Sequence, residues 1–147
     1  MTTLFGEESK SIRALNWKQP YCYLMMHGKV ETRTWYTGYR GLVLMCASKS
    51  PYSNKQLLEI AGDKQWSRIV QMTDYVDLIS GQAQSVGFLY GCRPMTIEDE
   101  DKCFVKYRPG LYCHLYTDVK AIKPFPHKGS QGWKKMPSGL YENLQFL

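Results

Sequence analysis

A run of six apolar residues at positions 42–47 restricts the fold of this 147-residue chain more than any other feature. Gly41 precedes the run, and the polar residues Ser48, Lys49 and Ser50 follow it. A short apolar run bounded in this way predicts a strand that is buried on both faces. The chain is long enough for one such core but not for two, so we expect a single domain.

Several segments around this run also have the patterns of strands. Strands are expected at residues 12–15, 29–35, 85–92, 111–119 and 120–123, with Pro124 ending the last. Along 111–119, the alternation predicts that Cys113 faces the core and that His114 faces outward. Gly87 and Gly91 predict that another backbone or a bulge comes close to the strand at 85–92.

Three helices are expected in the first half of the chain. Pro20 suits the first position of a short helix, which Gly28 is well placed to end. Ser53 and Gln56 have the spacing of a capping box and open a second helix, which should stop at Gly62. A third helix should follow directly. Because strands and helices do not alternate regularly, we expect an α+β fold with a curved mixed sheet or small barrel.

The segment at 29–35 carries the most informative pattern. Its β-branched residues alternate with charged or aromatic ones, so a strand here would place Lys29, Glu31, Arg33 and Trp35 on one face. An exposed strand face with paired charges would give the same pattern. The indole in this row favours a lined cleft instead.

The positive charge of the chain is concentrated toward one end. The net charge is +6, and four of the acidic residues lie together at 98–101, in a stretch expected to be an exposed loop or helical turn. Residues 119–141 contain five lysines and no acid. After the strand that ends at Pro124, this segment is expected to be an irregular basic tail. Such a surface attracts polyanions. A solvated lysine-rich face is the alternative.

The five cysteines indicate reduced thiols rather than a disulfide framework or a zinc site. Their number is odd, and no pair has the spacing of a zinc motif. We therefore expect no bridge, no metal and no cofactor. The N-terminus lacks the apolar stretch of a signal peptide, and no apolar run approaches the ~20 residues of a membrane span. A cytoplasmic protein without membrane contact is expected, with a polar leader at 1–11, a domain at 12–136 and a tail at 137–147.

Three segments together resemble the ASCH family, a branch of the PUA-like barrels. Residues 15–35 are similar to the family's opening pattern QPxAxLIxxGxKxxExRxW, and residues 39–49 to the strand YRGxLLIHASK. Residues 118–133 are similar to the closing pattern VxxLxxPxPxKGxQGLW. The order of the segments matches the family. One spacing differs, because Lys29 precedes Glu31 by two positions where the family pattern has three.

The resemblance implies a PUA-like curved mixed β-barrel of about five or six strands with flanking helices. It also implies a ligand, RNA or a modified nucleobase, in a cleft beside the segment GKVETRTW. The binding residues carried over onto this chain are Gly28, Lys29, Glu31, Arg33, Trp35, Arg40, Ser48 and Lys49, and Lys128 joins them from the basic tail.

Three functions are compatible with these features. The first is a non-enzymatic binder of RNA or single-stranded nucleic acid, with cations on phosphates and Trp35 stacked on a base. The second is a hydrolase acting on a modified nucleoside such as acetylated cytidine, with Lys29 and Glu31 as acid–base pair. Thr32 and Thr34 are near, but by alternation they should face away from that pair. The third is a protein-interaction module that docks the basic tail on an acidic partner.

Overall fold

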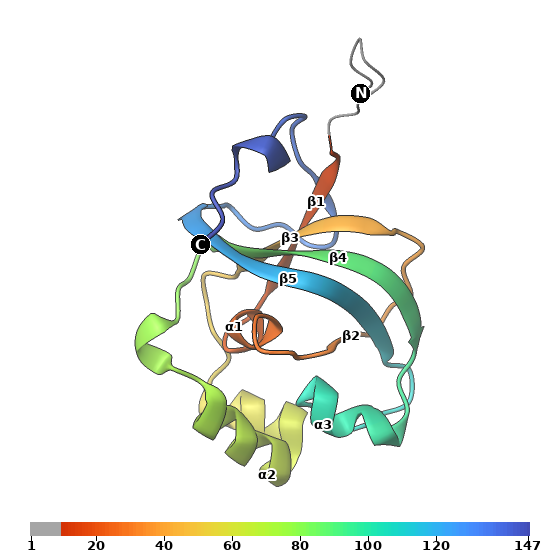
Figure 1. Cartoon of the computed structure of the whole chain (residues 1–147). Coiled ribbons are helices and arrows are strands. Elements are labelled where there is room, and N and C mark those ends of the chain that lie inside the picture. The colour runs from red at the N-terminus through yellow and green to blue at the C-terminus, as the bar shows by residue number, and fades with distance from the viewer. Residues whose placement is uncertain (1–9) are drawn as a thin grey trace.

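The computed structural model describes residues 10–147, so nearly all of the expected leader lies outside the described part (Figure 1). Six strands form one sheet in the order β2-β5-β4-β3-β1-β6. Strands β1 and β3 are parallel, and all other neighbours are antiparallel. The strands are β1 (Ile12–Trp17), β2 (Glu31–Arg33), β3 (Gly41–Ala47), β4 (Gln82–Pro94), β5 (Tyr112–Pro126) and β6 (Lys134–Lys135).

The sheet curls into a half-barrel with its helices on one side. In Figure 1, β3, β4 and β5 arch over the short helix α1 (Tyr21–Met25), while α2 (Asn54–Met72) and α3 (Glu100–Cys103) lie beyond it. The expected α+β fold with a curved mixed sheet is confirmed at this level. Short 3₁₀ turns lie at Tyr75–Asp77, Ile97–Asp99 and Tyr141–Asn143.

Irregularities in the strand pairing give the sheet its curvature. The register of β4 against β5 shifts at three places, and bulges of this kind bend and twist a strand. At Gly87, a Cβ atom would lie only 2.8 Å from Met45 Cε and 3.0 Å from Val119 Cγ2. The register shift between Val86 and Phe88 is the bulge predicted near Gly87, and the missing side chain there leaves room for Met45 and Val119 of the neighbouring strands.

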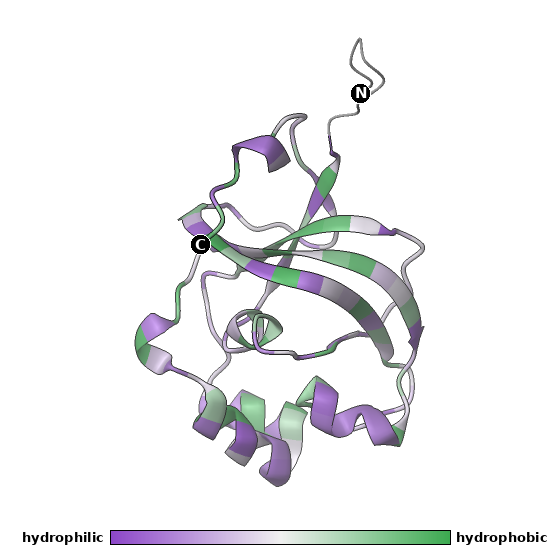
Figure 2. Cartoon of the chain, viewed as in Figure 1, coloured by the Kyte–Doolittle hydropathy of each residue, from purple (hydrophilic) through white to green (hydrophobic). Residues whose placement is uncertain are grey.

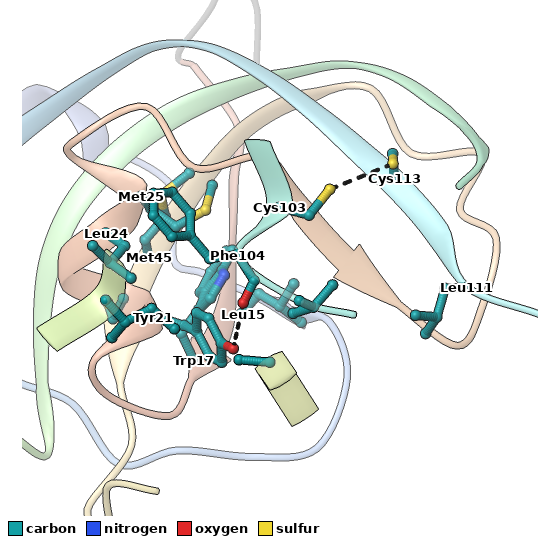
Figure 3. Packing of buried hydrophobic residues seen from close by; sticks show 14 of the residues in the cluster. Leu15, Trp17, Tyr21, Leu24, Met25, Met45, Cys103, Phe104, Leu111 and Cys113 are labelled. Carbon is teal, nitrogen blue, oxygen red and sulfur yellow. Dashed lines mark hydrogen bonds between the residues drawn. The ribbon is translucent and has the colours of Figure 1, made fainter. Parts of the chain in front are cut away.

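Strand β3 separates two hydrophobic clusters, as expected for a strand buried on both faces. Val43 and Met45 belong to the larger cluster, and Leu44 and Cys46 to the smaller one. Figure 3 shows part of the larger cluster, where residues of β1, α1 and α3 meet below the curved strands. Residues of the expected tail cover the smaller cluster, among them Leu140, Tyr141 and Leu144.

The helices begin and end close to the predicted residues. Pro20 precedes α1, and Gly28 follows it with a φ of +93°. The Ser53–Gln56 capping box opens α2, and Gly62 interrupts that helix with a φ of +79°. The chain continues as helix beyond this kink, so Gly62 joins two helical segments. At the kink, the carbonyl of Ile60 accepts a hydrogen bond of 3.0 Å from the backbone N–H of Lys106. Figure 2 shows hydrophilic residues along α2 and α3.

Strand β5 differs from the sequence prediction in length. Two strands separated near residue 120 were expected, with an end at Pro124, but one strand runs through to Pro126. Pro124 is tolerated because the register against β4 shifts between Ala83 and Ser85, and Pro124 has no partner in that ladder.

The orientation of His114 was also predicted wrongly, because it is fully buried. Alternation gives an outward residue only where one face of a strand meets solvent, and here Trp35 lies over the imidazole.

Two further segments differ in part from the sequence prediction. The basic tail is not wholly irregular, because Lys134 and Lys135 form β6 and pair with β1. The acidic stretch forms a 3₁₀ turn and α3, in agreement with the helical turn expected there. Asp99 in that stretch is buried, however, and accepts hydrogen bonds of 2.7 Å and 2.9 Å from Arg93. The hydrogen bond from Arg93 holds the pKa of Asp99 well below its usual range.

The five cysteines are all unbridged. Within residues 10–147, no helix is both long and apolar enough to cross a bilayer. The same residues contain no cluster of three or more His, Cys, Asp or Glu side chains placed to hold a metal ion.

Candidate ligand-binding site

A cavity of about 350 Å³ lies beside β2, and it brings together the central residues of the predicted site. Lys29, Glu31, Arg33 and Trp35 all line it, although β2 itself includes only Glu31–Arg33. The expectation that Glu31, Arg33 and Trp35 share one concave surface is therefore confirmed. The remaining walls come from β1 and the residue after it, α1, the loop between β3 and α2, α2 itself and the segment after α3. The residues are Asn16, Trp17, Lys18, Tyr21, Ser48, Tyr52, Ile60, Val105, Arg108 and Leu111, together with Thr32 and Thr34.

Glu31 is the electrostatic centre of this cavity. Its Oε1 lies 3.1 Å from Lys29 Nζ, and its Oε2 lies 2.8 Å from Arg33 Nε. The backbone N–H of Thr32 also donates to Oε1. The contact with Arg33 Nε is ionic, since the geometry at this nitrogen does not form a hydrogen bond. Lys29 and Glu31 are both buried, so each charge depends on the other for compensation.

The two cations keep Glu31 ionised. Burial alone would raise the pKa of Glu31, but the charges of Lys29 and Arg33 outweigh it and hold the pKa below its usual value. A carboxylate in this state is a good hydrogen-bond acceptor and a weak base.

Aromatic rings support both cations of the motif. Lys29 Nζ lies 4.8 Å from the centre of the Tyr21 ring, and the Arg33 guanidinium lies 4.9 Å from the Trp17 ring. The hydroxyl of Tyr21 donates to the carbonyl of Phe104 over 2.8 Å (Figure 3). Trp17 and Tyr21 are buried, whereas Trp35 and Tyr52 are half-buried. Trp35 and Tyr52 are therefore the rings with faces that a ligand can reach.

Trp35 is held from two sides. Its ring makes edge contacts with His114, at 4.9 Å between centroids, and with Trp133, at 5.9 Å. The carbonyl of Trp35 lies 2.9 Å from His114 Nε2. Since a carbonyl can only accept, Nε2 carries the proton, and Nδ1 has no partner among the described residues. Trp133 donates its indole N–H to Thr37 Oγ1.

The burial of His114 predicts a loss of stability on mild acidification. Burial lowers the pKa of His114, so the unfolded chain binds a proton more readily than the folded one. The contribution of His114 to the free energy of unfolding is fully present above about pH 6.5. As the pH falls below that value, this contribution decreases by at most about 1.4 kcal/mol per pH unit. Urea unfolding of the parent and of His114→Gln between pH 7.5 and 5.5 should give a shallower decline for the variant.

His27 provides the control for this experiment, because it is exposed on the surface after α1. His27→Gln should keep the parent's pH dependence. Burial also lowers the pKa of His127, so part of the decline should remain in His114→Gln. An identical decline in His114→Gln and in the parent would contradict the prediction.

Two further cavities continue the first one along the surface. A cavity of about 630 Å³ shares Asn16, Arg33, Trp35 and Ser48 with it and is closed by residues 129–132. A third of about 620 Å³ shares Asn16 and Ser48 and adds, among others, Lys49, His127 and Lys128. Asn16 Nδ2 donates to the carbonyl of Ser130 over 2.9 Å. The three cavities thus form a connected groove, which starts at Glu31 and ends between Lys49 and Lys128.

The predicted binding residues divide into three groups. Five of them line the Glu31 cavity, and Lys49 and Lys128 line the far end of the groove. Gly28 and Arg40 lie outside the groove. Gly28 borders another cavity, beside Tyr116, which has Lys29 in common with the Glu31 cavity, and Arg40 donates to the backbone carbonyls of Thr37 and Tyr39. The five residues at the Glu31 cavity are Lys29, Glu31, Arg33, Trp35 and Ser48.

The structure adds residues that the sequence did not single out. Tyr52 and Arg108 had no motif of their own, and Arg108 lies in a segment without regular structure. Trp17 and Tyr21 lie on either side of Pro20 in the segment 15–35. Their place in that segment was the only feature of the sequence that indicated a role in the site. Thr32 and Thr34 border the cavity together with Glu31, although alternation predicted the opposite face.

Positive charge dominates the cavity wall. Lys18, Lys29, Arg33 and Arg108 face a single carboxylate, that of Glu31. Within residues 10–147, neither Lys18 nor Arg108 forms an ion pair, so their charges are available to an anionic ligand. No family model matches this chain, and no curated protein matches it.

Proposed function

We propose that this chain is an ASCH-type domain of the PUA-like class and binds RNA or another single-stranded nucleic acid, with one nucleobase in the Glu31 cavity. The observation that carries the proposal is the connected groove, which joins a small charged cavity to lysines at its far end. Ligand pockets occupy roughly 300–1,000 Å³, so the cavity of about 350 Å³ suits a single base rather than a folded polynucleotide.

The cavity contains the groups that hold a base. The half-buried rings of Trp35 and Tyr52 offer faces for stacking, as in sequence-tolerant binders of single strands. Glu31 stays ionised and can accept from an exocyclic amine, such as that of cytosine or adenine. Arg33 lines both the first and the second cavity and adds positive charge where the sugar–phosphate chain would leave the Glu31 cavity, while Arg108 adds positive charge within it.

Replacing Lys49 and Lys128 together by alanine tests the phosphate path. Binding of labelled RNA and DNA oligonucleotides, followed by anisotropy over a range of salt concentrations, should weaken similarly for all sequences. The slope of log affinity against log salt should become shallower by ~0.7 for each phosphate of a single strand that the protein no longer neutralises.

Lys134 and Lys135 provide a matched control of equal charge. They lie exposed on β6 and line none of the three cavities. The basic tail was expected to act as one surface, but this geometry separates Lys128 from those two lysines. The Lys134→Ala, Lys135→Ala variant should bind almost like the parent. Equal losses of affinity in the two double variants would mean that net charge attracts the oligonucleotide, without a path along the groove.

A hydrolase acting on a modified nucleoside is the second candidate. Lys29 Nζ and Glu31 Oε1 lie 3.1 Å apart, and the cavity wall includes Thr32, a hydroxyl residue that alternation had placed elsewhere. The low pKa of Glu31 favours binding over proton abstraction. Turnover of acetylcytidine by the parent, followed by chromatography and abolished in Glu31→Gln, would reverse this preference.

A further inference from the structure

Two cysteines that are ten residues apart in sequence lie side by side in the fold. The Sγ atoms of Cys103, the last residue of α3, and Cys113, in β5, are 3.8 Å apart (Figure 3). Both side chains are fully buried. The proposed function assigns no role to either of them.

Charged groups surround one of the two thiols. Cys113 Sγ lies 3.6 Å from Asp99 Oδ2 and 3.9 Å from Arg93 Nη1. The contact with Cys103 lowers the pKa of the Cys113 thiol, and this effect outweighs burial, which raises it. The same contact and burial raise the pKa of Cys103. One thiol of the pair is therefore the better nucleophile, and the other keeps its proton, as in dithiols that oxidise in two steps.

The segment between these cysteines forms part of the cavity wall. Val105, Arg108 and Leu111 lie in it, and all three line the Glu31 cavity. Both ends of the segment lie next to β2. At the first end, the Lys102 carbonyl accepts a hydrogen bond of 2.8 Å from the N–H of Val30, the residue before β2. Cys113 is also opposite Thr32 in the pairing of β2 with β5. A covalent bond between the two sulfurs would thus fix both ends of a wall of the cavity.

We propose that Cys103 and Cys113 are a reversible redox pair, which closes to an intramolecular disulfide under peroxide and reopens with a dithiol reductant. The Cys113 thiolate takes one oxygen from the peroxide and becomes a sulfenic acid, and the rest of the peroxide leaves as water. The Cys103 thiol then attacks this sulfur and expels a second water. Two thiols and one hydrogen peroxide give one disulfide and two waters.

The burial of both thiols determines how the reaction proceeds. Peroxide reaches Cys113 only when the segment after α3 opens, and residues 104–111 contain turns and irregular backbone without a helix or strand. Oxidation is therefore slow compared with that of an exposed thiol. The disulfide does not depend on the proposed function, because it forms with or without a ligand in the cavity.

The test is mass spectrometry of the full chain after treatment with hydrogen peroxide. The monomer should lose about 2 Da, because two thiol hydrogens are removed. After denaturation and alkylation, the number of modified cysteines should fall from the five free thiols of the reduced chain to three. A peptide map should join Cys103 to Cys113, and dithiothreitol should restore the original mass.

Two variants separate this pair from the other thiols. Cys92→Ser removes a half-buried thiol of β4 and should leave the mass loss unchanged, whereas Cys113→Ser should abolish it. If Cys113→Ser does not fold, the peptide map of the parent decides alone. The proposal is overturned if Cys103 and Cys113 remain alkylatable after peroxide. It is equally overturned if the peptides that carry Cys103 or Cys113 gain about 16 Da per added oxygen in place of the joining bond, or if dimers linked through Cys92 are the only disulfide product.

Discussion

Glu31→Gln is expected to destabilise the chain by about 3–5 kcal/mol, the usual result of removing one partner from a buried ion pair. The amide keeps the shape of the side chain but cannot compensate Lys29, whose side chain is 1% exposed. Urea unfolding at neutral pH measures the change. A second readout is acid sensitivity. The pKa of Glu31 is lowered in the folded state. The contribution of Glu31 to the free energy of unfolding is therefore present above about pH 4.3 and is lost as the pH falls below that value.

The variant should therefore lose less stability than the parent on strong acidification. Glu59 on α2 provides the control, because it is an exposed carboxylate, and Glu59→Gln should change stability by no more than about 0.5 kcal/mol. Equal unfolding midpoints for Glu31→Gln and Glu59→Gln would show that Lys29 finds another way to compensate its charge.

Trp35→Ala should weaken oligonucleotide binding by roughly 1–3 kcal/mol, the usual effect of removing one stacked ring. That corresponds to a decrease of about 5- to 150-fold in affinity. The salt dependence should stay near that of the parent, because the variant keeps every cation that neutralises a phosphate. This combination distinguishes Trp35 from Lys49 and Lys128, whose replacement changes the salt slope.

Two further variants show whether a loss of binding in Trp35→Ala comes from the missing stacking ring or from disturbed packing around it. Trp35→Phe keeps a ring against His114 and Trp133 and should recover most of the affinity. Tyr36→Ala removes the neighbouring exposed ring, which lines none of the groove, and should bind like the parent. A Trp35→Ala variant that stays folded and binds at full strength would remove the stacking role.

Local patterns predicted the parts of the fold that depend on local physics. The apolar run at 42–47 became the buried β3, and the Ser53–Gln56 capping box opens α2. Such signals act within a few residues and do not require knowledge of neighbours in space. Glu31, Arg33 and Trp35 line one cavity as predicted, but Thr32 and Thr34 line it too, so strand alternation alone does not explain the arrangement.

Residues whose role depends on distant segments could not be found in this way. His114 is buried because Trp35 lies over it, and these residues are 79 positions apart. Arg108 reaches the cavity from a loop whose path is set by α2 and α3. Lys29, in contrast, was predicted correctly from the sequence. It lies before β2 and is one position closer to Glu31 than in the ASCH pattern, yet its long side chain still reaches Glu31.

Gly62 does not line the cavity, but the kink at this residue affects the position of a segment that does. At this kink the carbonyl of Ile60 accepts a hydrogen bond from the N–H of Lys106, a residue outside the helix. That bond positions the segment that carries Val105 and Arg108, while Ile60 itself borders the cavity. A substitution at residue 62 could therefore change the width of the cavity without replacing any residue that lines it.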